Sequence, residues 1–189
     1  MTETPNPNIV DTDSLTGEMH PIRRVVVALG SNLGERLASL QGAVDALADT
    51  PDFFVTGVSP VYETDPVDAP ECSGPFLNAV LLADTTLPAA RLMERALAIE
   101  DAFERERSEV RNAPRTLDVD LIVVGDRRSN EDFLRLPHPR AHERAFVLQP
   151  WHDLEPDAVF PELGPISDLL DATDATSVRK REDLTLEAG

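Results

Sequence analysis

The chain of 189 residues has little of several features that would each indicate a particular class of protein. Cys72 is the one cysteine, so the chain cannot form an internal disulfide framework, and a reducing cytoplasm is its predicted location. No run of about 18 apolar residues occurs, which argues against a transmembrane helix. The N-terminal stretch MTETPNPNIVDTDSLTGEMHP has no basic start followed by an apolar segment, so we expect no secretory signal.

Positive charge is also scarce, because 17 basic residues stand against 35 acidic ones and the formal net charge is −18. Nucleic-acid binders usually present a basic face, so DNA and RNA are not expected partners, and an anionic lipid surface fits equally poorly. Lysine is nearly absent, since Lys180 is the single lysine. Without a GK[ST] motif the chain has no Walker-type phosphate loop.

The pattern of apolar residues predicts one domain between two polar ends. Residues 1–21 are rich in Pro, Thr, Asn and Asp and are predicted to be a disordered tail. Residues 22–170 are predicted to form the single domain, and residues 171–189 a polar C-terminal tail. We find no internal repeat and no second domain.

Hydrophobic periodicity within this domain predicts the order strand, helix, strand, strand, helix, strand. The strands are RRVVVALG, FFVTGVSPVYET, FLNAVLLADT and TLDVDLIVVG, and the helices follow the first and third of them. Asn32 and Glu35 resemble a capping box at the start of the first helix. The order is the split βαβ pattern of ferredoxin-like folds, an α+β sandwich of one antiparallel sheet with both helices on one face. The other face would be free to carry a site, and the residues after Gly125 are expected to add short elements.

Two aspartates interrupt the last predicted strand, within the segment RNAPRTLDVDLIVVG. Because side chains alternate along a strand, Asp118 and Asp120 share one face, about 7 Å apart, with Ile122 and Val124. The other face is apolar and should meet the helices; it consists of Leu117, Val119, Leu121 and Val123. Two carboxylates this close stay ionised only beside cations, and their hard oxygens suit Mg²⁺. The alternative is a structural network with arginines.

Arginines gather just before this strand, at Arg105, Arg107, Arg111 and Arg115. Their planar donors hold phosphate oxygens well, often with two hydrogen bonds. A solvated helix end is the alternative, with the arginines paired to the glutamates Glu100, Glu104, Glu106 and Glu109. Carboxylates and arginines together predict a magnesium–nucleotide site for phosphoryl chemistry, which needs mainly placement and neutralisation of charge.

The same segment resembles the signature of the 6-hydroxymethyl-7,8-dihydropterin pyrophosphokinases of the folate pathway. Five further blocks resemble the family's motifs in the family's order: ALGSNLGER, SPVYETDPV, GPFLNAVLL, IEDAFERER and LPHPRAHERAFVLQPW. They cover about residues 25–161. The resemblance implies a ferredoxin-like fold and transfer of the β,γ-diphosphate of ATP to the hydroxymethyl oxygen of the pterin, with release of AMP. The chain departs from the family pattern at Glu104, Ser108, Asn112 and Pro139.

On the nucleotide side, the resemblance implies that Asp118 and Asp120 hold two Mg²⁺ ions that bridge the ATP phosphates. It implies that Arg107 and Arg115 contact phosphates and that Arg105 supports catalysis or loop closure. Further contacts to ATP would come from Glu100, the backbone of Leu121, His138 and Arg144. From the residues alone, His138 between two prolines is as readily a rigid surface turn.

On the pterin side, the resemblance implies a ring stacked between Phe76 and Phe146, with Asn78 bonded to its edge. Further contacts would come from main chain around Thr64, Asp65 and Val67, and the pocket wall from Gly30 and Asn32. From the residues alone, the two phenylalanines are ordinary core residues, and Asn32 and Gly30 are a helix cap and a tight turn.

The expected partners are therefore ATP and the pterin, for a cytoplasmic protein that is a monomer, although an oligomer is not excluded. Two other functions stay open at this point. One is a different Mg²⁺-dependent nucleotidyl or phosphoryl transferase; a nucleotidyl transferase would release pyrophosphate. The other is a non-enzymatic ferredoxin-like binding module whose aspartates form structural ion pairs.

Overall fold

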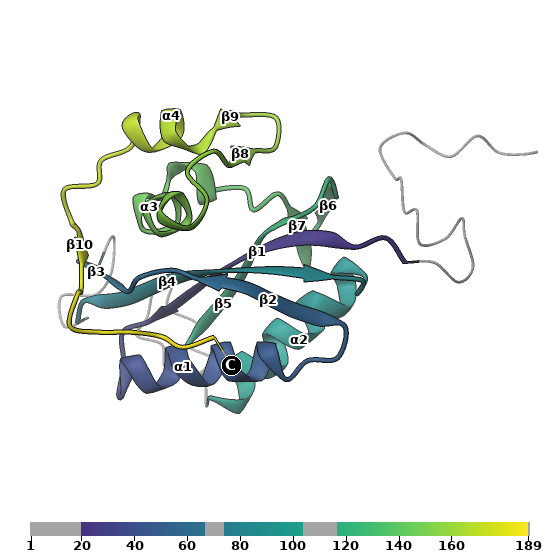
Figure 1. Ribbon diagram of the computed structural model, residues 1–189, viewed down its shortest axis with the longest axis horizontal. Helices are drawn as coiled ribbons and strands as arrows, with labels where there is room; N and C mark the ends of the chain where they lie inside the picture. The colour runs from purple at the N-terminus through teal and green to yellow at the C-terminus, as the bar shows by residue number, and fades with distance from the viewer. Residues whose placement is uncertain (1–19, 67–73, 104–116, 189) are drawn as a thin grey trace, which may run out of the picture.

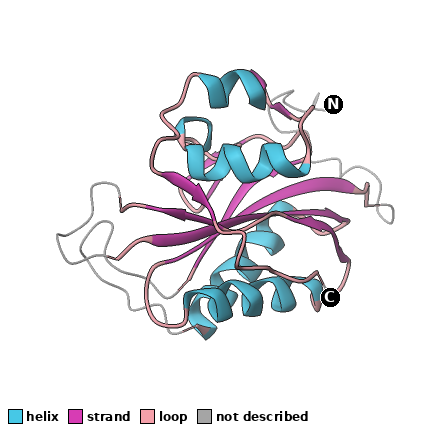
Figure 2. Ribbon diagram, turned by 60° about the vertical axis from the view of Figure 1, so that its left-hand side comes forward, coloured by secondary structure: helices cyan, strands magenta, loops and turns pink. Residues whose placement is uncertain are grey.

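The computed structural model describes residues 20–66, 74–103 and 117–188. Nearly all of the predicted N-terminal tail, and all four arginines predicted just before the last strand, lie outside these ranges. In the described residues, one antiparallel sheet lies between two helical layers (Figures 1 and 2). No helix in this part of the chain has the length and apolar character needed to span a membrane.

The predicted order of strands and helices is present. These elements are β1 (Arg23–Ser31), α1 (Arg36–Ala48), β2 (Phe53–Val58), β3 (Tyr62–Thr64), β4 (Phe76–Thr85), α2 (Ala89–Ala102) and β5 (Asp118–Val124). The second predicted strand is divided into β2 and β3 around Pro60, a residue that cannot donate to a strand ladder. Both halves pair with β4.

Further short elements follow β5. They are β6 (Ser129–Glu131), β7 (Leu134–Leu136), η2 (Ala141–Glu143), α3 (Ala145–Leu154), β8 (Val159–Phe160), β9 (Gly164–Pro165), α4 (Ile166–Asp171) and β10 (Val178–Lys180). The strands of the main sheet run in the order β10-β3-β4-β1-β5, with β2 also on β4. The long strand β1 thus lies between β4 and β5 and is antiparallel to both, as a ferredoxin-like fold requires.

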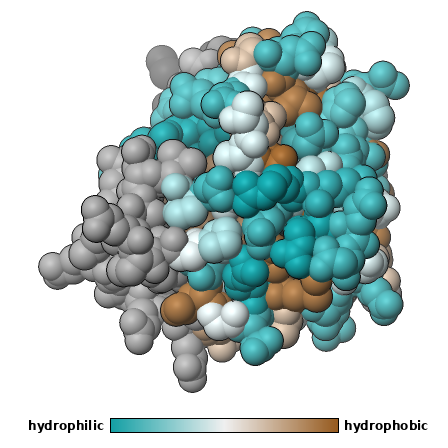
Figure 3. Space-filling model, turned by 90° about the vertical axis from the view of Figure 1, so that its left-hand side faces the viewer, coloured by the Kyte–Doolittle hydropathy of each residue, from teal (hydrophilic) through white to brown (hydrophobic). Residues whose placement is uncertain are grey.

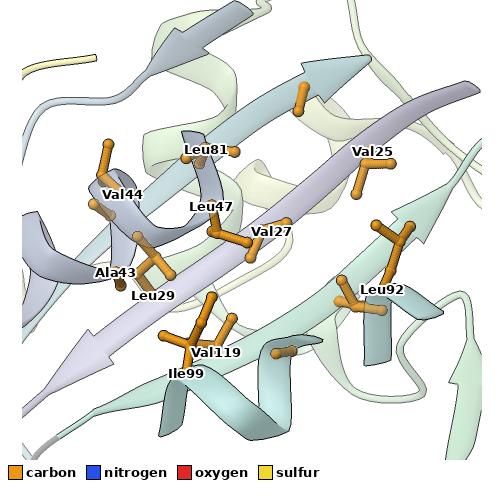
Figure 4. Close-up of a cluster of buried hydrophobic side chains, with 14 of the residues drawn as sticks. Val25, Val27, Leu29, Ala43, Val44, Leu47, Leu81, Leu92, Ile99 and Val119 are labelled. Atoms are coloured by element: carbon orange, nitrogen blue, oxygen red, sulfur yellow. The ribbon is translucent and has the colours of Figure 1, made fainter. Parts of the chain in front are cut away.

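The first core lies between the sheet and the helices α1 and α2. From β1 it takes Val25, Val27 and Leu29, which alternate along the strand and point to the same side. Figure 4 shows these side chains meeting helical residues that include Val44, Leu47, Leu92 and Ile99. The buried residues of both helices recur every three or four positions, so each helix turns one face to this core.

The opposite face of the sheet is covered along part of its length by α3 and α4 (Figure 2). There Val26, Val80 and Ile122 pack against Leu148 and other buried residues of this layer, among them Trp151, Phe160 and Ile166. The sequence predicted short elements after Gly125 but left this face free for a site. The face is only partly free: its apolar residues are covered by a second layer that excludes water, and the remainder carries the candidate site residues described below.

A bulge alters the predicted alternation near the end of β5. Val26 pairs with Val123 while the next residue, Val27, pairs with Leu121, so Ile122 is an extra residue on β5. Val123 consequently joins the second core and Val124 the first, the reverse of their predicted faces. The prediction holds for Val119 and Leu121, which precede the bulge.

The start of α1 also differs from the prediction. The helix begins at Arg36, with Glu35 as its N-cap residue and no side-chain capping bond. Gly34 has φ +67°, a left-handed conformation, so the backbone that follows Asn32 is not yet helical. Asn32 is therefore not the helix cap that the sequence indicated; it is buried just after β1.

The C-terminal segment, predicted as a polar tail, contacts the domain from β10 onward. β10 pairs with β3, and the chain then returns along the α1 side of the sheet (Figure 1). Leu186 is buried in the first core and Leu184 packs against it. Gln41 on α1 exchanges two hydrogen bonds with the backbone of Glu187. Burial of these two leucines stabilises the docking. Two leucines only two positions apart are easily overlooked in a polar sequence.

Candidate active site

The pairing of four antiparallel strands places several predicted residues on one face of the sheet. Asn78 lies opposite Gly30 on one side and Tyr62 on the other, and Gly30 in turn lies opposite Asp118. Residues paired across antiparallel strands point to the same face. Two positions from these residues along the strands, Asp120 of β5 lies opposite Ala28 of β1, and Phe76 of β4 lies opposite Thr64 of β3. This row of paired residues across β3, β4, β1 and β5 brings together residues that are distant in the sequence.

Gly30 lies at the centre of this arrangement. A Cβ atom added at Gly30 would lie 3.2 Å from Asn78 Oδ1, 3.8 Å from Phe76 Cδ1 and 4.0 Å from Asp118 Cβ. Asn78 and Phe76, predicted to bind the pterin, and Asp118, predicted to bind the metal, thus lie around a residue without a side chain. From the sequence we expected Gly30 in a tight turn or in the pocket wall. It lies instead on a strand, and its missing side chain leaves the space at which the three side chains meet; we call this position the floor of the site.

Asn78 is held in one orientation by a neighbouring side chain. Its Nδ2 donates a hydrogen bond to Thr64 Oγ1 at 2.8 Å, and both residues are buried. Oδ1 is the atom nearest Gly30, so the acceptor side of the amide points to the shared floor. Thr64 was predicted to contribute main chain, and the structure adds this contact through its hydroxyl.

Asp118 and Asp120 are partly exposed on β5, the edge strand next to β1. Their partners across the ladder, Gly30 and Ala28, have small side chains or none, so the carboxylates are not crowded from that side. Among the described residues, no group of three or more His, Cys, Asp or Glu side chains could hold a metal. Two carboxylates fit Mg²⁺ nevertheless, because this ion retains waters and takes phosphate oxygens as further ligands.

Arg144 at the N-terminus of α3 lies within electrostatic reach of both aspartates. Burial lowers the pKa of its guanidinium, and the charges of Asp120 and Asp118 act in the opposite direction. The guanidinium also lies 5.6 Å from the ring centre of Phe146, in the first turn of α3. The second helical layer therefore brings a cation and an aromatic ring to the face that carries the carboxylates.

His138 is fixed at the outer edge of β5 by backbone bonds. Its N–H donates to the Ile122 carbonyl oxygen at 2.8 Å, and its Nδ1 accepts from the Arg140 N–H at 3.2 Å. Burial and the nearby Arg144 charge lower the pKa of His138 to about 4. The imidazole is thus neutral near pH 7, with Nε2–H left as the donor.

Glu100 and Leu121 lie behind this face, on the side of α1 and α2. Glu100 is 4% exposed, and its Oε1 accepts a hydrogen bond of 2.9 Å from the Val119 N–H, between the two aspartates. The side chain of Leu121 belongs to the first core, so only its backbone could reach a nucleotide. Glu100 therefore supports the carboxylate strand from below rather than facing Asp118 and Asp120.

The remaining predicted site residues either lie at the exposed end of β3 or fall outside the described part of the chain. Asp65 is exposed just after β3 and forms an ion pair with Arg179, Nη2 to Oδ1, at 2.9 Å. Arg105, Arg107, Arg115 and Val67 lie outside the described residues.

Tyr62 is a residue of this face that the sequence reasoning missed. Its hydroxyl donates to Asp153 Oδ2 of α3 at 2.6 Å, and burial together with Asp153 raises the pKa of the phenol. The alternation of Tyr62 and Thr64 across Glu63 was the signal that could have placed both side chains on one face. The bond connects β3 to the second helical layer.

The fold and this face together define a class: a ferredoxin-like α+β domain with paired carboxylates beside an amide and an aromatic ring. The model of the 7,8-dihydro-6-hydroxymethylpterin-pyrophosphokinase (HPPK) family matches residues 26–156. The chain belongs to this family, and it is a transferase of the pyrophosphokinase type. The matched range includes β3, β4, β5 and the part of β1 that carries Ala28 and Gly30.

Curated relatives carry the same family name. The 2-amino-4-hydroxy-6-hydroxymethyldihydropteridine pyrophosphokinase of Mycobacterium tuberculosis is 42% identical over 172 residues, which cover 82% of this chain and 88% of that protein. The Pseudomonas aeruginosa protein of that name is 40% identical over 151 residues, covering 80% and 92%.

A solved structure has a similar fold. It is the wild-type HPPK-DHPS of Plasmodium falciparum with pterin and p-hydroxybenzoate, with a TM-score of 0.61 and 14% identity. The match covers 82% of this chain and 43% of that chain, so this protein spans less than half of its length. At this identity the similarity concerns the fold alone.

Proposed function

We propose that this protein transfers the β,γ-diphosphate of ATP to 6-hydroxymethyl-7,8-dihydropterin, giving AMP and the pterin diphosphate in tetrahydrofolate biosynthesis. The observation that carries the proposal is the convergence of Asp118, Asn78 and Phe76 around Gly30 in a chain of this family. That arrangement puts a carboxylate for a metal–phosphate group beside groups suited to a flat heterocycle. The protein acts in the cytoplasm as a monomer.

The pterin ring lies against Phe76 and is stacked from the other side by Phe146. Asn78 bonds the ring edge; an amide can both accept and donate, and its Nδ2 is already bonded to Thr64. Backbone around Thr64, Asp65 and Val67 completes this side. Support comes from the shared face of Phe76, Asn78 and Thr64 and from the position of Phe146 on the covering helix.

ATP lies along the outer side of β5. Asp118 and Asp120 would hold two Mg²⁺ ions, which would neutralise the charge of the phosphates. Arg107, Arg115 and Arg144 contact phosphate oxygens, and Arg105 supports the transfer. The neutral His138 donates from Nε2, Glu100 maintains the strand, and the Leu121 backbone meets the adenine.

The reaction forms one bond and breaks one. The hydroxymethyl oxygen of the pterin attacks the β-phosphorus, the bond from that phosphorus to the oxygen bridging to the α-phosphate breaks, and AMP leaves. The hydroxyl proton passes to water as the new bond forms. The contribution of this chain is placement, because the row across Asn78, Gly30 and Asp118 fixes the pterin relative to the carboxylates.

The nucleotide product tests this proposal. The protein is incubated with ATP, Mg²⁺ and 6-hydroxymethyl-7,8-dihydropterin, and nucleotides are separated by chromatography. AMP formed in equal amount to pterin diphosphate supports the proposal. ADP would indicate an ordinary kinase, pyrophosphate a nucleotidyl transferase, and no turnover with no heat on binding Mg²⁺–ATP a binding module; each of these outcomes would overturn it.

A further inference from the structure

The segment after α4 lies beyond the residues matched by the family model, yet it contacts the strand proposed to hold the pterin. In β10, Val178 lies opposite Thr64, Arg179 opposite Glu63 and Lys180 opposite Tyr62. The Arg181 N–H then donates to the Val61 carbonyl oxygen at 2.8 Å. All three residues of β3 are thus paired on both sides, with β4 and with β10. We call residues 178–181 the C-terminal clasp.

The side chains of the clasp carry three successive cations in an otherwise acidic chain, and each meets an acidic partner. Arg179 donates to both oxygens of Asp65, at 2.9 and 3.2 Å. Arg181 Nη1 donates to Glu63 Oε2 at 3.0 Å. Two-pronged guanidinium–carboxylate bonds fix direction as well as distance.

Other elements meet at the same carboxylates. Arg36, the first residue of α1, donates to Glu63 Oε2 at 3.2 Å and to the Pro75 carbonyl oxygen at 2.7 Å. Lys180 Nζ lies 3.5 Å from Asp153 Oδ2, the oxygen that accepts the Tyr62 hydroxyl. The clasp is therefore tied to α1, α3 and β3 together. Figure 3 shows the side of the molecule at which β3 and β10 lie, and its described surface is mostly hydrophilic.

The connection to the pterin runs through Thr64. Its hydroxyl sets the orientation of the Asn78 amide by accepting from Nδ2 at 2.8 Å. Its backbone lies between β4 and β10, and Arg179 holds the next residue, Asp65. Without β10, the three-residue strand β3 would be an edge strand with pairing on one side only.

We infer that Arg179 and Arg181 are positioning residues for the pterin site, acting through Asp65, Glu63 and Thr64 on the orientation of Asn78. The inference rests on the proposed function, since it concerns the same pterin site. In the main sheet β10 pairs with β3, whereas Asp118 and Asp120 lie on β5 at the other end of the strand order, so we expect the effect to be confined to the pterin side. We therefore expect KM for the pterin to change while KM for ATP does not.

The test compares variants of the full chain. Arg179→Gln/Arg181→Gln removes the two guanidinium groups, while the buried Leu186 and the partly buried Leu184 keep the segment attached. Arg181→Pro also removes the N–H that bonds to Val61, so it weakens the pairing even if the side chains prove dispensable. The matched control is Arg91→Gln/Arg135→Gln, which makes the same change of charge at exposed ion pairs away from β3.

We expect KM for the pterin to rise at least about fivefold in both clasp variants, with kcat and KM for ATP nearly unchanged. Hydrogen exchange should show faster exchange at residues 62–64, and the control should match wild type. Unchanged KM for the pterin in both variants, or equal increases for both substrates, would overturn the inference. AMP release by the wild type is measured first, so failure of the proposed function is seen there, independently of the clasp variants.

Discussion

At the scale of single residues, Gly30 joins the two halves of the proposed site. Gly30→Ala places a methyl group 3.2 Å from Asn78 Oδ1, closer than ordinary contact. Asn78 cannot easily move away, because it is buried and bonded to Thr64. We expect a loss of about 1–3 kcal/mol in the free energy of unfolding, measured in urea, together with an increased KM for the pterin.

Gly57→Ala is the matched control for this substitution. Its added methyl group would lie 3.4 Å from Leu154 Cδ2, an ordinary contact, and Gly57 is on β2 away from the candidate site. The control should leave KM for the pterin unchanged. If Gly30→Ala behaves in the same way, Gly30 is not the floor of the pterin site.

His138 gives a pH-dependent prediction. Its pKa is lowered to about 4 from an ordinary value of 6.5, so between these pH values the unfolded chain binds a proton that the folded chain does not. The contribution of His138 to stability is therefore complete above about pH 6.5 and decreases as pH falls towards 4. An NMR titration of the histidine ring protons measures this directly, and a midpoint near 6.5 for His138 would contradict the described environment.

Which site residues could be predicted from the sequence depends on how local their signal is. Asp118 and Asp120, and likewise Phe76 and Asn78, alternate within single strands, so the sequence predicts their shared faces. The bond of Tyr62 to Asp153 joins residues 91 positions apart, and nothing local indicates it. The convergence on Gly30 needs the register of three strands, which periodicity alone does not supply.

At the scale of elements, β5 depends on a helix for one backbone bond. Glu100 of α2 accepts the Val119 N–H, which an edge strand would otherwise leave without a sheet partner. Glu100→Ala removes the acceptor from a buried donor, so we expect a loss of about 1–3 kcal/mol in the free energy of unfolding. Glu100→Gln keeps an oxygen for this bond and should lose less. Equal stability of the alanine variant and wild type would show that the bond is dispensable.

The elements themselves were largely predictable where they are long and periodic. β4 has the predicted bounds, and α2 follows the third strand as predicted, with Leu92, Ala96 and Ile99 buried at helical spacing. The bulge at Ile122 was not predictable, because a run of apolar residues gives no sign of which one is extra. The three residues of β10 are too few and too polar to indicate a strand, so its pairing with β3 emerges only from the fold.

At the scale of the whole molecule, the net charge of −18 should produce self-repulsion in the compact state. Salt screens such repulsion, with a Debye length of about 10 Å at 0.1 M. We expect Tm to rise as NaCl is increased from about 0.02 to about 0.5 M, which differential scanning calorimetry can follow. A fall in Tm over this range would mean that ion pairs such as those of the clasp outweigh the repulsion.

The arrangement of the whole molecule explains why the site lies where it does. α1 and α2 close one face of the sheet, α3 and α4 cover part of the other, and the site residues occupy the row that joins β3, β4, β1 and β5. The second helical layer contributes Arg144 and Phe146 at its edge. The catalytic-domain limits of residues 22–170 stay a prediction, and the contacts of residues 178–187 argue for including the C-terminal segment.

In the proposed function, Asp118 and Asp120 serve catalysis rather than folding. The most direct measurement is the turnover of Asp118→Asn and Asp120→Asn at saturating Mg²⁺, ATP and pterin, beside their free energies of unfolding. We expect each variant to lose roughly 100-fold or more in kcat while folding as stably as wild type. Wild-type turnover in either variant, or a loss of turnover that only follows unfolding, would contradict it.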